Sequence, residues 1–286
     1  MPSPTDFNLS PYFDDFNEGK KFHRILFRPA FAVQARELTQ SQSILQNQLE
    51  RVSDHLFEKG SMVIPGEIAY DLNYYSVKLT SFSGSSILSN FVNVEFTGQT
   101  SGVVARVVNS DVATSSDPNS LYLKYETSGS SNTSTAFTDG ETCQGTTTID
   151  GISTTLNFVV ASTHTGAAAS IKQGVYYING FQVQVSDQTL ILDKYTNNPS
   201  YRVGLLVTES FITSNEDASL NDNAQGTSNQ NAPGANRFKI DLTLTKKTIA
   251  STEDANFVEL LRLKNGILQN QVRTTQYGVL EDTFAR

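Results

Sequence analysis

Most of the chain after Gly60 alternates large apolar residues with other residues at a period of two, which restricts it to a fold built mainly from β-strands. The alternation is clearest at residues 92–96, 121–125, 156–160 and 238–244. Residues 175–178 and 181–185 flank Asn179-Gly180, a dipeptide that readily adopts the positive φ angles of a two-residue hairpin turn. We therefore expect antiparallel β-modules joined by polar loops rich in Ser, Gly and Asn.

Two segments predict helices instead. In the first, residues 35–57, with Gly60 as the stop signal, the apolar positions follow one another at gaps of four and three residues. This heptad seam predicts a coiled coil that joins copies of the chain, most simply as a homotrimer, with one polar residue fixing the register. The alternative is an ordinary amphipathic helix packed on the β-domain. The predicted oligomer interface consists of Leu38, Gln42, Leu45, Leu49, Val52 and Leu56.

The second predicted helix covers residues 252–272, where apolar residues recur at helical spacing although Gly266 weakens its middle. Its segment 267–271 repeats residues 44–48 letter for letter, and we interpret the two as helices with the same role. The expected fold class is thus mainly β with two notable helices, an α+β chain of several domains.

The first 30 residues read as an extended arm, because they contain prolines, acidic residues and aromatics without a helical or strand period. Leaving so many aromatic rings in water would be unfavourable, so we expect the arm to bind a neighbouring subunit or another protein. The alternative is an arm packed on its own domain. The predicted docking residues are Phe7, Tyr12, Phe13 and Phe16.

The net charge of -8 and the lack of a Lys/Arg run argue against nucleic-acid binding as a function class, because phosphates repel an acidic surface. Cys143 is the single cysteine, so the chain forms no internal disulfide. The sequence contains neither the features of a signal peptide nor an apolar run of about 18 residues, so we expect no membrane insertion.

The residue patterns of common catalytic and metal sites are missing. His23, His55 and His164 do not have zinc-site spacing, and there is no phosphate loop, dinucleotide motif or nucleophile elbow. Residues 215–223 resemble a calcium loop, but Asp222 and Ser228 stand where Gly and the bidentate Glu should be. We therefore predict no enzyme, no cofactor, and no catalytic or metal-binding residues.

Several segments, in order, resemble a family of virion structural proteins of tailed phages, notably contractile-tailed cyanophages, that contain a phage domain of unknown function. They are residues 27–40, 60–66, 174–181, 220–226 and 231–235. The resemblance implies a non-enzymatic component of the baseplate or tail fibre, made in the host cytoplasm and located in the virion, that binds itself and other baseplate or tail-fibre proteins. It also implies that the chain is the N-terminal part of a longer fibre.

Residues 96–105 resemble a small β-module of phage tail proteins, so we expect an inserted β-module at 90–158. The rest of the expected organisation is an arm at 1–30, an oligomerising helix at 31–60, a main β-body at 61–89 and 159–250, and a C-terminal helix with an exit toward a fibre at 251–286.

Two rival functions remain open. One is a receptor-binding tail-fibre adhesin that recognises host surface glycans. The other is a fibre depolymerase, which needs two carboxylates about 5–9.5 Å apart.

Overall fold

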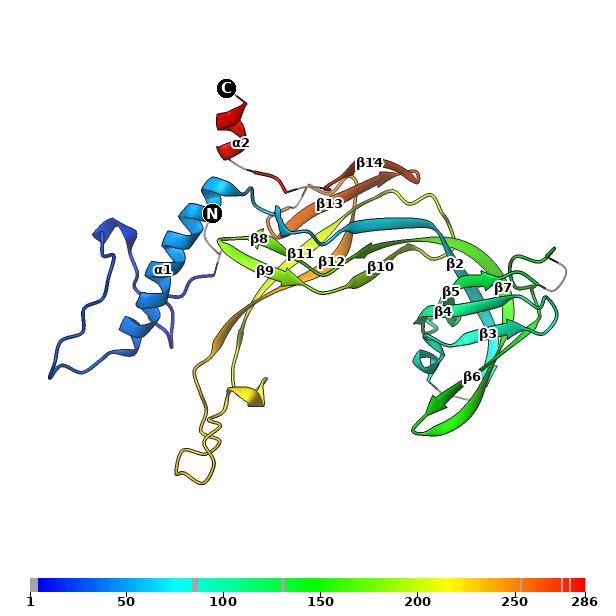
Figure 1. Cartoon of the computed structure of the whole chain (residues 1–286), viewed down its shortest axis with the longest axis horizontal. Helices are drawn as coiled ribbons and strands as arrows, with labels where there is room; N and C mark the ends of the chain where they lie inside the picture. The colour runs from blue at the N-terminus through cyan, green and yellow to red at the C-terminus, as the bar shows by residue number, and fades with distance from the viewer. Residues whose placement is uncertain are drawn as a thin grey trace.

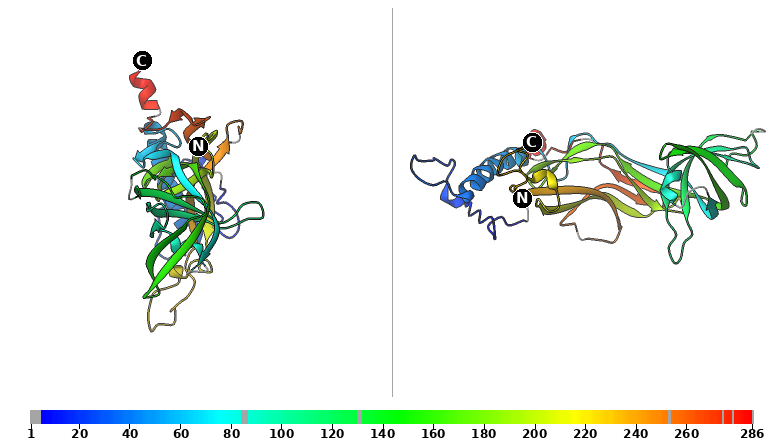
Figure 2. Two further views of the ribbon diagram at one scale, coloured as in Figure 1. Left: turned by 90° about the vertical axis from the view of Figure 1, so that its right-hand side faces the viewer. Right: turned by 90° about the horizontal axis from the view of Figure 1, so that it is seen from below.

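The computed structural model describes residues 5–83, 87–129, 132–252, 254–273, 275–277 and 279–285. The molecule is elongated, with the long helix α1 (Ala35–Leu56) at one end and a small β-barrel at the other (Figures 1 and 2). The other helices are short: α2 (Val279–Phe284) and the 3₁₀ helices η1 (Glu18–Lys20), η2 (Leu88–Phe91) and η3 (Ala218–Leu220).

The strands are β1 (Met62–Ile64), β2 (Ile68–Ser83), β3 (Glu95–Gly98), β4 (Val104–Asp111), β5 (Ser120–Thr127), β6 (Thr142–Ile149), β7 (Ile152–Ile171), β8 (Gly174–Ile178), β9 (Phe181–Val185), β10 (Gln188–Asp193), β11 (Tyr201–Ile212), β12 (Arg237–Thr248), β13 (Phe257–Lys264) and β14 (Ile267–Gln271). All of their pairings are antiparallel. The predicted strands at 121–125, 156–160 and 238–244 lie within β5, β7 and β12.

The barrel forms because the sheet order β7-β2-β5-β4-β3-β6 closes on itself through pairing of β6 with β7. Closure leaves the barrel strands without an open sheet edge. Its interior holds a hydrophobic core drawn from residues 77–160, with Phe91, Phe96 and Phe158 in mutual ring contact. The predicted insertion at 90–158 forms most of the barrel, but the barrel also includes part of β2 before residue 90 and part of β7 after residue 158.

A second core fills the central body. It lies between the sheet β1-β8-β9, the first part of β2, the last part of β7 with β10, and the sheet β12-β11-β13-β14. The predicted hairpin at Asn179-Gly180 is confirmed: φ is 49° and 88° at these two residues, and Ile178 pairs with Phe181. The long strands β2 and β7 contribute residues to both cores and so connect the body to the barrel.

The predicted fold class is wrong in its helical part. With 45% of residues in strands and 13% in helices, the protein is mainly β with a single long helix. The first predicted helix is present as α1, but its heptad seam is not packed on its own chain: the helix buries Ile44, Glu50 and Ser53 instead. The second predicted helix, at 252–272, is the hairpin of β13 and β14.

The β13–β14 hairpin turns at Asn265 and Gly266, both of which have positive φ, 51° and 72°. It is held on the body by Arg202 of β11, whose side chain is 7% exposed. The guanidinium of Arg202 donates to Glu259 of β13 at 2.5 Å and to Asp254 just before it at 2.6 Å. The apolar residues of this segment therefore pack as a strand against β11.

Candidate assembly surface

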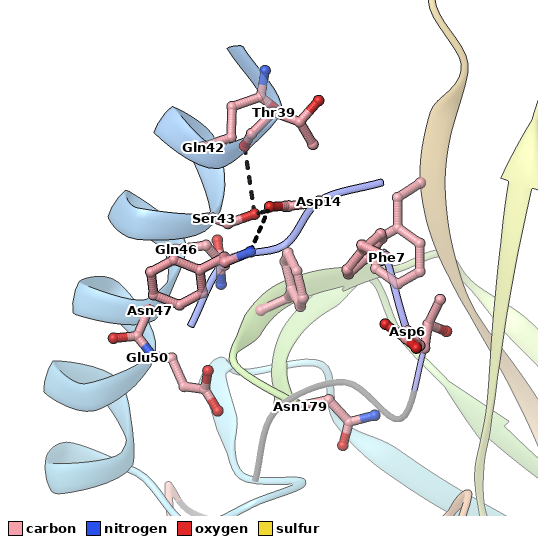
Figure 3. Close-up of a pocket in the computed structure, with 14 residues that line it drawn as sticks. Asp6, Phe7, Asp14, Thr39, Gln42, Ser43, Gln46, Asn47, Glu50 and Asn179 are labelled. Carbon is pink, nitrogen blue, oxygen red and sulfur yellow. Dashed lines mark hydrogen bonds between the residues drawn. The ribbon is translucent and has the colours of Figure 1, made fainter. Parts of the chain in front are cut away.

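Helix α1 packs on its own chain through polar side chains. Gln46 Nε2 donates to the carbonyl oxygen of Gly180 at 2.7 Å, and the Tyr177 hydroxyl donates to Asp54 at 2.5 Å. Ser43 donates to Asp14 of the arm (Figure 3). A surface helix usually turns its apolar face inward, so this arrangement is the reverse of the ordinary one.

A cavity of about 560 Å³ lies between α1, the arm and the β8–β9 hairpin, lined by residues that include Asp6, Asp14, Glu50 and Asn179 (Figure 3). Burial, and then the nearby Asp54, raise the pKa of the Glu50 carboxyl above its ordinary value. Asp14 is engaged by Ser43 and by the backbone N–H of Phe16 at 3.2 Å. These hydrogen bonds join the helix, arm and hairpin to one another, so the cavity serves as a structural junction.

The opposite face of α1 is apolar and exposed. Its exposed fractions are 55% for Leu38, 70% for Leu45, 51% for Leu49, 60% for Val52 and 37% for Leu56. Gln42 is also exposed. The structure thus brings the five apolar residues of the predicted interface onto one exposed helix face, which we call the α1 stripe, while Gln42 lies at its border and also lines the cavity.

The arm residues predicted to dock on a partner divide into two groups. Phe7 contacts Phe238 and Phe211 of the same chain, with ring centroids 5.0 and 5.9 Å apart, and Tyr12 lies 5.1 Å from Phe211. For Phe7 and Tyr12 the expectation that the arm avoids its own body is therefore wrong, because one end of the β11–β12 ladder presents the rings of Phe211 and Phe238 to them.

The other two predicted docking residues are less enclosed. Phe13 is 57% exposed, while Phe16 is half-buried beside the cavity. Their role toward a partner stays a prediction.

Residues 22–33, between the arm and α1, form a second exposed apolar surface that the sequence analysis missed. We call it the entry segment. The signal was present, since six large apolar residues fall within twelve positions, and all but Ile25 are exposed. Their exposed fractions are 66% for Phe22, 74% for Leu26, 54% for Phe27, 63% for Phe31 and 54% for Val33.

The loop that resembles a calcium site uses its acidic side chains internally. Asp217 accepts from the backbone N–H of Ser219 at 2.9 Å, and Glu216 accepts from that of Thr213 at 2.8 Å. In the part of the chain that the structure describes, no three His, Cys, Asp or Glu side chains are grouped as metal ligands would be. Nor does any helix among those residues have the length and apolar character needed to cross a membrane.

Comparison with known proteins gives one family. The family described as a domain of unknown function, DUF4815, matches residues 10–123 and 106–286. Neither the curated proteins nor the solved structures contain a match to the chain. Since the matched segments cover nearly all of the sequence, the chain belongs to the DUF4815 family.

Proposed function

We propose that this chain is a non-enzymatic structural protein of a tailed-phage virion, a baseplate or tail-fibre component that works by assembling with copies of itself, as a homotrimer. The virion context rests on the sequence resemblance. The observation that carries the assembly function is the orientation of α1, whose polar face lies on its own body while the α1 stripe faces outward.

The exposed stripe is unfavourable in water and offers a large gain on association. Covering one fully exposed Leu or Val side chain contributes about 1.5–3 kcal/mol, and the five are on average about half exposed, so together they contribute about 4–8 kcal/mol per chain. Losing the freedom of separate molecules costs about 4–15 kcal/mol, so the stripe balances a substantial part of that cost.

The long axis of the molecule separates two ends with different properties. The α1 stripe lies at one end, and the closed barrel lies at the other, connected by the uninterrupted strands β2 and β7 (Figure 1). In a component that joins a tail to a fibre, one end binds other copies and neighbouring proteins. The opposite end is held at a fixed distance from that assembly. This shape supports the attachment role.

The test of self-assembly is the double substitution Leu45→Asp and Leu49→Asp. We expect light scattering to give three times the chain mass for the wild type at micromolar concentration and the chain mass for the variant, because carboxylates cannot be buried in an apolar interface. The matched control is Val112→Asp with Ile152→Asp, two residues that are 67% and 69% exposed far from α1. A monomeric wild type, or a variant of unchanged mass, contradicts the assembly function.

The virion role is tested by locating the chain in a map of the intact particle. A position in the baseplate or at the base of a fibre supports the proposal. A position at the tip of a fibre would favour the receptor-binding adhesin instead.

A further inference from the structure

Two exposed apolar surfaces follow one another in the sequence. The entry segment ends two residues before α1 begins, and the α1 stripe extends along that helix to Leu56. Each surface carries five large apolar side chains, all between 37% and 74% exposed. Isolated exposed apolar residues are ordinary, but a concentration of this kind indicates a protein interface.

Within one chain the residues just before the entry segment are held on α1 by two ion pairs. Glu18 forms one with Arg51, and Asp15 forms one with Arg36 at 3.4 Å. The half-buried Ile25 and the buried Ile44 line the same pocket, on a side of the helix away from the stripe. The segment is therefore anchored to its own helix while Phe22, Leu26 and Phe27 remain in solvent.

We infer that the entry segment of one copy covers the α1 stripe of the next copy, so that each chain both gives and receives one contact. The inference rests on the proposed self-assembly and specifies how it occurs. Such a contact joins two different surfaces, so three copies related by a threefold rotation close into a ring in which every stripe is covered.

The surface area agrees with a second copy as the occupant. If each side chain exposes on the order of 100 Å², each contact joins on the order of 500 Å² of one copy to a similar area of the next, and the total of about 1,000 Å² reaches the lower limit for a specific interface. The two surfaces also occur once each per chain, which gives them equal numbers in any assembly of identical copies.

Site-specific cross-linking tests the contact. Two differently tagged copies are co-expressed, one carrying Phe27→Cys and the other Leu49→Cys, and treated with a short bismaleimide. The native Cys143 does not interfere, because it is fully buried and burial raises the pKa of its thiol. We expect a covalent heterodimer at a yield roughly a hundredfold above that of the control pair, since contact raises the local thiol concentration to the millimolar range.

The control pair replaces Phe27→Cys with Ile152→Cys, which is 69% exposed on the barrel. A heterodimer that forms equally well in the control pair overturns the inference. Cross-linking mainly between two Leu49→Cys copies overturns it too, because the stripe then contacts another stripe.

A third arm of the experiment places Phe27→Cys and Leu49→Cys in one chain. Cross-linking inside single chains would mean that the entry segment folds over its own helix, and the inference would fail. If any of these three outcomes is found but light scattering still gives a trimer, the proposed self-assembly stands without this contact. A monomeric wild type removes both.

Discussion

Gly180 and Gly151 occupy the same position in two hairpin turns with different surroundings. Gly180 has a φ of 88° in the β8–β9 turn, and Gly151 has a φ of 82° in the β6–β7 turn. A methyl group on Gly180 would lie 3.1 Å from Cγ and Cδ of Glu50 on α1. Among the described residues, nothing lies within 4 Å of the corresponding position on Gly151. The two glycines therefore separate backbone strain from helix packing.

Alanine in this left-handed conformation costs about 1–2 kcal/mol at either position. At Gly180 the added methyl must also displace the Glu50 side chain, and overpacking of this kind costs about 1–3 kcal/mol more. We expect the free energy of unfolding to fall by about 1–2 kcal/mol in Gly151→Ala and by about 2–5 kcal/mol in Gly180→Ala.

The assay is urea denaturation at one fixed protein concentration, because self-association would make stability depend on concentration. Hydrogen exchange then locates the effect: amides of α1 should lose protection in Gly180→Ala and keep it in Gly151→Ala. Equal losses of stability in the two variants, with unchanged exchange in α1, would refute the idea that the hairpin supports the helix.

Three further predictions test other contacts. The pKa of Glu50 is raised in the folded protein, so the stability that its neutral form contributes is fully present below pH 4.5 and is lost as the pH rises through the folded-state pKa. Glu50→Gln keeps this group neutral, so the variant should unfold at a higher urea concentration than the wild type at pH 8 but not at pH 4. Arg202→Leu should lower the free energy of unfolding by about 3 kcal/mol, while the exposed Arg106→Leu changes the thermal midpoint little. Phe7→Ala should cost about 1–2 kcal/mol in the same denaturation assay, because its ring packs on the body, whereas Phe13→Ala should cost much less.

The sequence predicted elements whose signals are local. The gaps of four and three residues correctly identified α1, and Asn179-Gly180 correctly identified a hairpin. The β13–β14 hairpin was missed although Asn265-Gly266 is the same turn dipeptide. There the apolar residues also fit a helical period, and we gave that period more weight than the turn.

The repeated pentapeptide shows why periodicity alone was insufficient. Residues 44–48 lie in α1, whereas the identical residues 267–271 form β14. Pairing with β13 supplies backbone partners to the second copy, so its conformation depends on neighbours distant from the pentapeptide itself. The outward direction of the α1 stripe was likewise beyond a sequence pattern, because it depends on which face the body binds.

The passage of β2 and β7 through both cores has a mechanical consequence. Body and barrel are joined by two strands that stay paired from Ile68↔Ile171 in the body to Ser83↔Asn157 in the barrel, although the register shifts between Asp71 and Tyr74 and twice more between Lys78 and Ser81. Hydrogen bonds between antiparallel strands run across the strand direction, so a pull along the long axis loads many of them together in shear. A pull along the long axis should therefore be carried by both strands at once, and body and barrel should stay joined under it.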